Sequence, residues 1–184
     1  MKKILTFVLA VVMIASFAAC GSKKPASGTL IEGKTIEDVF AAVDAKFAEK
    51  YGEGYGAVAM STPIEEQFLA DFMELDFSAY EEFAGSMSMS MTNSDAFFVI
   101  KAKEGKVEAV TQAVEKRIAD LVTQYQYYPV NGSYDRAMAG EAYVKGNYVF
   151  CIVVGQFADM DEQTPNFEED VQMTKQVIDS MFNA

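Results

Sequence analysis

Residues 86–103 read SMSMSMTNSDAFFVIKAK, and the expected fold is built outward from this stretch. Its first six residues alternate strictly between Ser and Met, which is the two-residue period of a β-strand. Thr92–Asp95 is typical of a turn, and Ala96–Lys103 predicts a second strand that begins with apolar side chains on both faces. Strands of that kind lie inside sheets that are covered on both sides. We therefore expect Ala96–Lys103 to be a central strand.

A helix is expected next, over residues 105–126. Apolar side chains repeat there at helical spacing and form one stripe. The stripe consists of Val107, Val110, Val114, Ile118, Leu121, Val122 and Tyr125. The charged side chains are expected largely on the other faces of the helix, and they are Glu108, Lys116, Arg117 and Asp120.

The same order of elements then recurs toward the C-terminus. Ala142–Lys145 and Tyr148–Val154 are separated by Gly-Asn and predict a β-hairpin, whose second strand is the most apolar run outside the N-terminal segment. Pro165-Asn166 precedes a final helix with acids in its first turn. The second half of the chain is thus expected to run ββαββα, an α+β fold with a mainly antiparallel sheet.

The composition excludes several classes of function. The chain has 184 residues, a net charge of −12, two Cys and no His. Without His it lacks the commonest general base and metal ligand, and two Cys make neither a disulfide framework nor a structural zinc site. The excess of acids argues against nucleic-acid binding, which needs Lys and Arg to displace counterions. An apolar share of 51 % is sufficient for a folded core.

The N-terminus has the layout of a secretory signal. Lys2 and Lys3 precede an apolar stretch, Ile4–Phe17, that ends shortly before Cys20. A Cys directly after Phe-Ala-Ala resembles the lipobox of bacterial lipoproteins, in which the sulfur receives a diacylglycerol and cleavage leaves the Cys as the first residue. This resemblance implies a signal peptide over residues 1–19 and lipidation of Cys20. An ordinary signal peptide and an uncleaved membrane anchor are the alternatives.

Cleavage would change the charge and expose a linker. It removes Lys2 and Lys3 and no acid, so that 13 basic residues face 27 acidic ones and the net charge becomes −14. Such a surface repels anionic headgroups, and attachment to the membrane would therefore rest on the acyl chains. Residues 20–34 are rich in Gly, Ser, Lys and Pro and are expected to form a flexible tether.

Residues 35–184 are expected to form a single domain. Thr35 is a plausible N-cap of its first helix. Gly56–Met60 predicts a short strand, and Thr62 followed by Pro63 predicts the start of a second helix. These N-terminal helices are expected to cover a face or an edge of the sheet.

Four stretches resemble a group of small lipoproteins from clostridia and related Gram-positive bacteria that carry a domain of unknown function. They are Ser94–Lys103, the Glu115–Arg117 part of the following helix, Tyr128-Pro129 and Val144–Val149. The resemblance covers roughly residues 35–158. It implies a location in the cell envelope and a compact α+β domain, and it transfers no catalytic or binding residue.

Met87, Met89 and Met91 are expected on one strand face. They would line the core or an apolar groove, since Met adapts to varied apolar partners. Three thioethers are also soft ligands that suit Cu(I), although no His or Cys lies nearby in the sequence. A ligand groove and a copper or small-molecule scavenger are therefore both open.

Aromatic side chains cluster after the long helix and suggest a second candidate surface. Tyr127, Tyr128, Tyr134 and Arg136 would form it, because Tyr is common in recognition surfaces. The alternative is a helix end whose tyrosines pack on the sheet.

No catalytic constellation is evident. Cys151 lies in an apolar strand, where a thiol behaves as a small hydrophobe, and Asp159–Glu162 reads as a solvated acidic loop. We expect no metal site and no cofactor. The sequence therefore favours a non-enzymatic lipoprotein, anchored in the cell membrane through its acyl chains and facing the extracytoplasmic side, that binds a protein, peptide or small ligand of the envelope. A hydrolase built on two converging carboxylates is a further alternative.

Overall fold

The computed structural model describes residues 28–156 and 165–183. Three expectations lie outside these residues: the signal peptide over 1–19, lipidation of Cys20 and the acidic loop Asp159–Glu162. None of the helices in the described ranges combines the length and the apolarity needed to cross a membrane.

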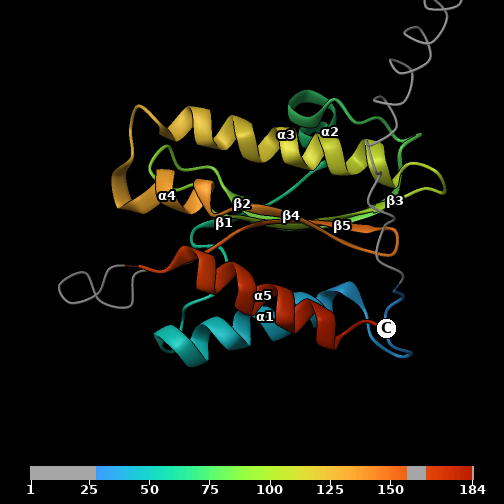
Figure 1. Ribbon diagram of the computed structural model, residues 1–184, viewed down its shortest axis with the longest axis horizontal. Coiled ribbons are helices and arrows are strands. Elements are labelled where there is room, and N and C mark those ends of the chain that lie inside the picture. Colours follow the sequence, from blue (N-terminus) through green and yellow to red (C-terminus); the bar gives the residue numbers. More distant parts are fainter. Residues whose placement is uncertain (1–27, 157–164, 184) are drawn as a thin grey trace, which may run out of the picture.

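One antiparallel sheet lies between two layers of helices (Figure 1). The strand order is β1-β2-β3-β5-β4. The strands are β1 (Ser61–Pro63), β2 (Tyr80–Ser88), β3 (Ala96–Ala102), β4 (Glu141–Lys145) and β5 (Tyr148–Val153). One face is covered by α2 (Glu66–Met73), α3 (Val107–Tyr125) and α4 (Ser133–Met138), and the other by α1 (Ile36–Tyr51) and α5 (Phe167–Ser180). The expected α+β class with an antiparallel sheet is confirmed.

The two most apolar strands, β3 and β5, lie in the interior of the sheet. Side chains of β3 alternate between two hydrophobic cores. Phe98 and Ile100 face the core under α2 and α3, whereas Phe97 and Val99 face the core under α1 and α5. None of these four side chains is more than 2 % exposed. This double burial is the reason that the sequence of β3 is apolar without alternation.

The helix boundaries follow the capping residues. The Thr35 hydroxyl accepts from the backbone N–H of Asp38, and the Asp38 carboxylate accepts from the backbone N–H of Thr35, which makes a capping box. Asn166 caps α5 in the same sense by accepting from the backbone N–H of Glu169. The helix starts expected at Thr35 and after Pro165-Asn166 are confirmed.

Residues 56–65 differ from the prediction. Gly56–Met60 forms turns, and the backbone N–H groups of Ala57 and Ala59 donate to side-chain carboxylates instead of a neighbouring strand. Thr62 and Pro63 belong to β1 and not to a helix, since an edge strand tolerates Pro. The second helix starts later, at Glu66.

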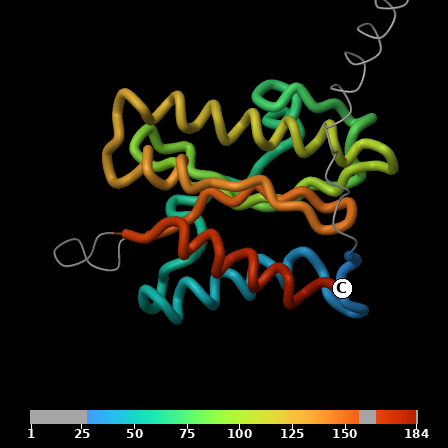
Figure 2. Tube along the Cα trace, viewed as in Figure 1, coloured from blue at the N-terminus to red at the C-terminus, as the bar shows by residue number. Residues whose placement is uncertain are grey.

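The beginning of the described chain is fastened to its end. The backbone N–H of Ile31 donates to the carbonyl of Met181 at 3.0 Å, and that of Asn183 donates to the carbonyl of Thr29 at 2.8 Å. Figure 2 shows this N-terminal segment beside the end of α5. Residues 28–34, the last part of the expected tether, thus contact the folded domain.

Candidate functional site

A groove of about 180 Å³ lies where α2 and α3 meet the end of β2 and the loop that follows it. Apolar side chains dominate its wall, with one cation among them. The lining residues are Phe68, Phe72, Met87, Ser88, Met89, Ser90, Met91, Arg117, Leu121, Gln124 and Tyr125.

All three methionines of the alternating run line this groove, but not from one strand face. β2 ends at Ser88, so that only Met87 is a strand residue, and it is buried. Met89 and Met91 lie beyond the strand and are 64 % and 81 % exposed. The expectation of a strand through Met91 is therefore wrong, whereas the gathering of the three side chains around one groove is what the structure shows.

Tyr125 holds the loop that carries the exposed methionines. Its hydroxyl lies 2.9 Å from the carbonyl oxygen of Ser90 and 2.7 Å from that of Asn93. At the end of β2, the backbone N–H of Ser88 donates to the carbonyl of Asp95, the residue before β3, at 2.8 Å. The rim of the groove is thus attached to α3 at one end and to β3 at the other.

Arg117 is the cation of the groove. It comes from the middle of α3, is 8 % exposed, and places its guanidinium carbon 5.5 Å from the ring centre of Phe68 and 5.7 Å from that of Phe72. It forms no hydrogen bond and no ion pair within the described residues, and its Nε is fully buried without a partner. Burial lowers the pKa of Arg117, because the charged form is poorly solvated there.

No anion near Arg117 is free to compensate its charge within the described residues. Asp120, one turn further along α3, is bound to Lys116 at 3.0 Å. The Cys151 thiol lies in the core under the same helices, and burial raises its pKa to about 12. A thiol with that pKa is neutral at physiological pH. Among the described residues, the two rings are thus the electrostatic partners in contact with the guanidinium, and Asp120 attracts it only from beyond ion-pair distance.

Sequence reasoning placed Arg117 on a polar face of its helix, and that was wrong. Positions 110, 114, 117 and 121 follow steps of four, three and four, so Arg117 lies on the buried stripe. The spacing contained this signal. Arginine is usually exposed to solvent, and this general preference was given more weight than the helical spacing.

The tyrosine surface is only partly assembled. Tyr127 and Tyr128 follow α3 and are exposed, while Tyr134 is half-buried against the core of the α3 face. Arg136 is 3 % exposed and does not reach that surface. The structure therefore separates Arg136 from the exposed tyrosines.

Arg136 belongs to a buried polar network. Its Nε lies 2.9 Å from Oδ1 of Asp95 and donates to the carbonyl of Gly155 at 2.8 Å, and Nη1 donates to Oδ1 of Asn93 at 2.9 Å. Burial raises the pKa of Asp95, while the Arg136 guanidinium and the hydrogen bonds to the Asp95 carboxylate oppose that rise. Since every partner is internal, we assign this network to the stability of the fold.

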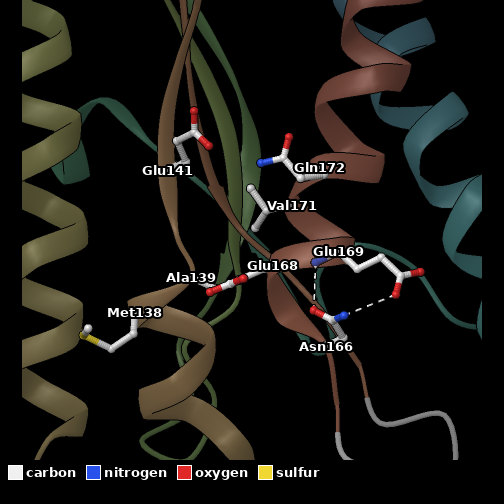
Figure 3. Close-up of a pocket in the computed structure, with 8 residues that line it drawn as sticks. All are labelled: Met138, Ala139, Glu141, Asn166, Glu168, Glu169, Val171 and Gln172. Atoms are coloured by element: carbon white, nitrogen blue, oxygen red, sulfur yellow. Dashed lines mark hydrogen bonds between the residues drawn. The ribbon is translucent and has the colours of Figure 1, made fainter.

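A second hollow, of about 470 Å³, lies between α4, β4 and the start of α5 (Figure 3). It is polar, and two of the three acids that line it, Glu141 and Glu169, have partners. Glu141 accepts from Lys175 at 2.7 Å, and Glu169 contacts Asn166 and Lys50. Nowhere in residues 28–156 and 165–183 do three or more His, Cys, Asp or Glu side chains converge as a metal site would require.

The fold and the groove define a small three-layer α+β domain with an apolar hollow whose wall contains an unpaired cation. Residues 55–154, more than half of the chain, match the family described as Domain of unknown function (DUF4358), and the protein belongs to that family. The whole groove lies inside the matched range, whereas α1 and α5 lie outside it. Searches of curated proteins and of solved structures found no match.

Proposed function

We propose that this protein is a lipoprotein on the extracytoplasmic side of the cell membrane of a Gram-positive bacterium, and that it acts there as a non-enzymatic binding module. The groove beside Arg117 is its binding site. The observation that carries this proposal is the combination of exposed Met89, Met91 and Phe72 on the rim with an unpaired cation in the wall. The lipobox-like position of Cys20 supports the location.

The size of the groove favours a segment of a partner protein over a small molecule. Pockets for drug-sized ligands measure roughly 300–1,000 Å³, and this groove measures about 180 Å³. That volume suits one large apolar side chain, with further contacts on the rim. Met and aromatic residues are enriched in protein interfaces, and an exposed Met adapts to its partner at low cost.

Copper binding by the three methionines is the weaker proposal. The thioethers share the groove, which favours it, but a guanidinium in the same wall repels a cation. Neither His nor a free thiolate assists, since the chain has no His and the pKa of Cys151 is about 12.

The proposal is tested by panning a random-peptide phage library on the full-length protein in detergent micelles. We expect enriched peptides with a large apolar residue. A variant carrying Met89→Ser and Met91→Ser should lose them, because the rim no longer offers apolar area.

The matched control carries Met60→Ser and Met138→Ser, two methionines that are also more than half exposed and lie outside the groove. It should retain the same peptides as the wild type. Enrichment that is absent, or that survives in the Met89/Met91 variant, would show that the groove is not the binding site.

A further inference from the structure

We infer that the partner segment carries a carboxylate side chain next to its apolar anchor residue, and that Arg117 binds this carboxylate. The inference rests on the proposed function and specifies the chemistry of the partner. It starts from a single fact about the groove: its one cation is buried and has no counterion.

The unpaired state of Arg117 is costly for the isolated protein. A guanidinium carries five N–H donors, and here none of them donates to a described residue. The two phenylalanine rings near the cation offer π-faces but no hydrogen-bond acceptor atom for its N–H groups. Buried donors without acceptors are rare in folded proteins unless another molecule completes them.

The atoms that face the groove are the terminal ones. Nε is completely buried, whereas Nη1 and Nη2 are not, and Arg117 is part of the groove wall. A ligand that fills the groove therefore meets these two nitrogens. A carboxylate matches them, because two parallel N–H···O bonds to one planar anion are the arrangement that Arg prefers.

The overall charge opposes an acidic ligand, whereas the groove wall favours an anion at Arg117. The chain carries a net charge of −12, which repels an acidic segment, but at 0.1 M salt this repulsion is largely screened beyond about 10 Å. Inside the groove, the half-buried Phe68 and the buried Leu121 limit the access of water and strengthen the attraction of Arg117 for a carboxylate. A purely apolar segment would leave the guanidinium unpaired and would cover it from water as well.

The inference is tested with synthetic peptides derived from the panning experiment. The most enriched peptide is made with its acidic residue and with the corresponding amide, Glu→Gln or Asp→Asn. Binding to the full-length protein is measured by fluorescence anisotropy. We expect the amide peptide to bind the wild type at least about tenfold more weakly, as a lost charge-assisted hydrogen bond predicts.

The Arg117→Met variant should bind the two peptides equally, so that the tenfold difference disappears. Arg117→Lys, which keeps the charge but not the fork, should show an intermediate difference and guards against a folding defect in the first variant. Lys116→Met is the matched control: it removes a neighbouring cation on α3 that points out of the groove, and it should retain the full difference.

The outcomes separate the two proposals. Peptides that require Met89 and Met91 but show no preference for an acid would overturn the role of Arg117 alone. An acid preference that persists in Arg117→Met would do the same. Failure to enrich any groove-dependent peptide would overturn the proposed function and this inference with it.

Discussion

Two buried arginines of the same domain differ in what surrounds them. Arg136 has Asp95, Asn93 and the carbonyl of Gly155 within hydrogen-bonding distance. Arg117 has two aromatic rings and no acceptor. A buried charge is tolerated when it is paired, so Arg136 fits a structural role. Arg117 fits a role that is completed by another molecule.

The first prediction follows from this contrast. Replacing Arg117→Met removes an unsatisfied donor and keeps the apolar stem, at the loss of the contacts with Phe68 and Phe72. We expect the free energy of unfolding to stay within about 1 kcal/mol of the wild type or to rise, because an unsatisfied buried donor and a cation–π contact are of similar magnitude. Arg136→Met should cost about 3–5 kcal/mol, because it leaves Asp95 as an unpaired buried charge.

Urea denaturation followed by circular dichroism measures both changes. If Arg117→Met destabilised the protein as much as Arg136→Met, Arg117 would be a structural residue, and no external partner would be needed to explain its burial.

At the scale of the elements, the sequence predicted those features whose cause is local. The apolar runs of β3 and β5, the stripe of α3 and the Thr35 cap lie in the chain as patterns, and the structure contains each of them. Features that depend on distant partners were not predictable. β1 is a strand because β2 lies beside it, and α4 is one short helix held by its contacts with α3.

The methionine run illustrates the same limit at the candidate site. Its strict alternation predicts a strand, but the strand stops at Ser88. The chain then turns back to β3, and the Tyr125 hydroxyl contacts the carbonyls of that turn. Where a strand ends is decided by its neighbours, which a pattern of six residues does not contain. The groove could be anticipated from the methionines, whereas its cation was overlooked.

The second prediction separates Met87 from Met89 and Met91. Met87 is buried in the core under α2 and α3, so Met87→Ala should cost about 2–5 kcal/mol of unfolding free energy. Met89→Ser and Met91→Ser change exposed side chains and should stay within about 0.5 kcal/mol. Chemical denaturation of the three single variants provides the comparison. Equal losses at all three positions would mean that the loop is as tightly packed as the strand.

At the scale of the whole molecule, the proposed function places a strongly acidic domain at a membrane surface. The net charge of −14 expected after removal of residues 1–19 gives no electrostatic attraction to anionic lipid. In the proposed function, attachment comes from acyl chains on Cys20, because each buried CH₂ contributes about 0.8 kcal/mol. A binding groove held near the membrane by such an anchor meets the exposed segments of other envelope proteins at raised local concentration.

The third prediction tests this anchor by counting thiols. The chain has two cysteines, Cys20 and Cys151. Cys151 is fully buried and its pKa is about 12, so the folded protein should not react with a thiol reagent at neutral pH. In denaturant one thiol should appear if Cys20 carries a thioether-linked diacylglycerol, because its sulfur is then blocked.

Two variants make the count decisive. Cys151→Ser, produced in the native host, should show no thiol at all in denaturant, and Cys20→Ser should show one thiol and leave the membrane fraction. Mass spectrometry of the wild type should find a mature N-terminus at residue 20 that carries lipid. Two reactive thiols in the denatured wild type would mean that Cys20 is free, and the proposed attachment to the membrane through Cys20 would then be wrong. The groove and its unpaired arginine do not depend on this result.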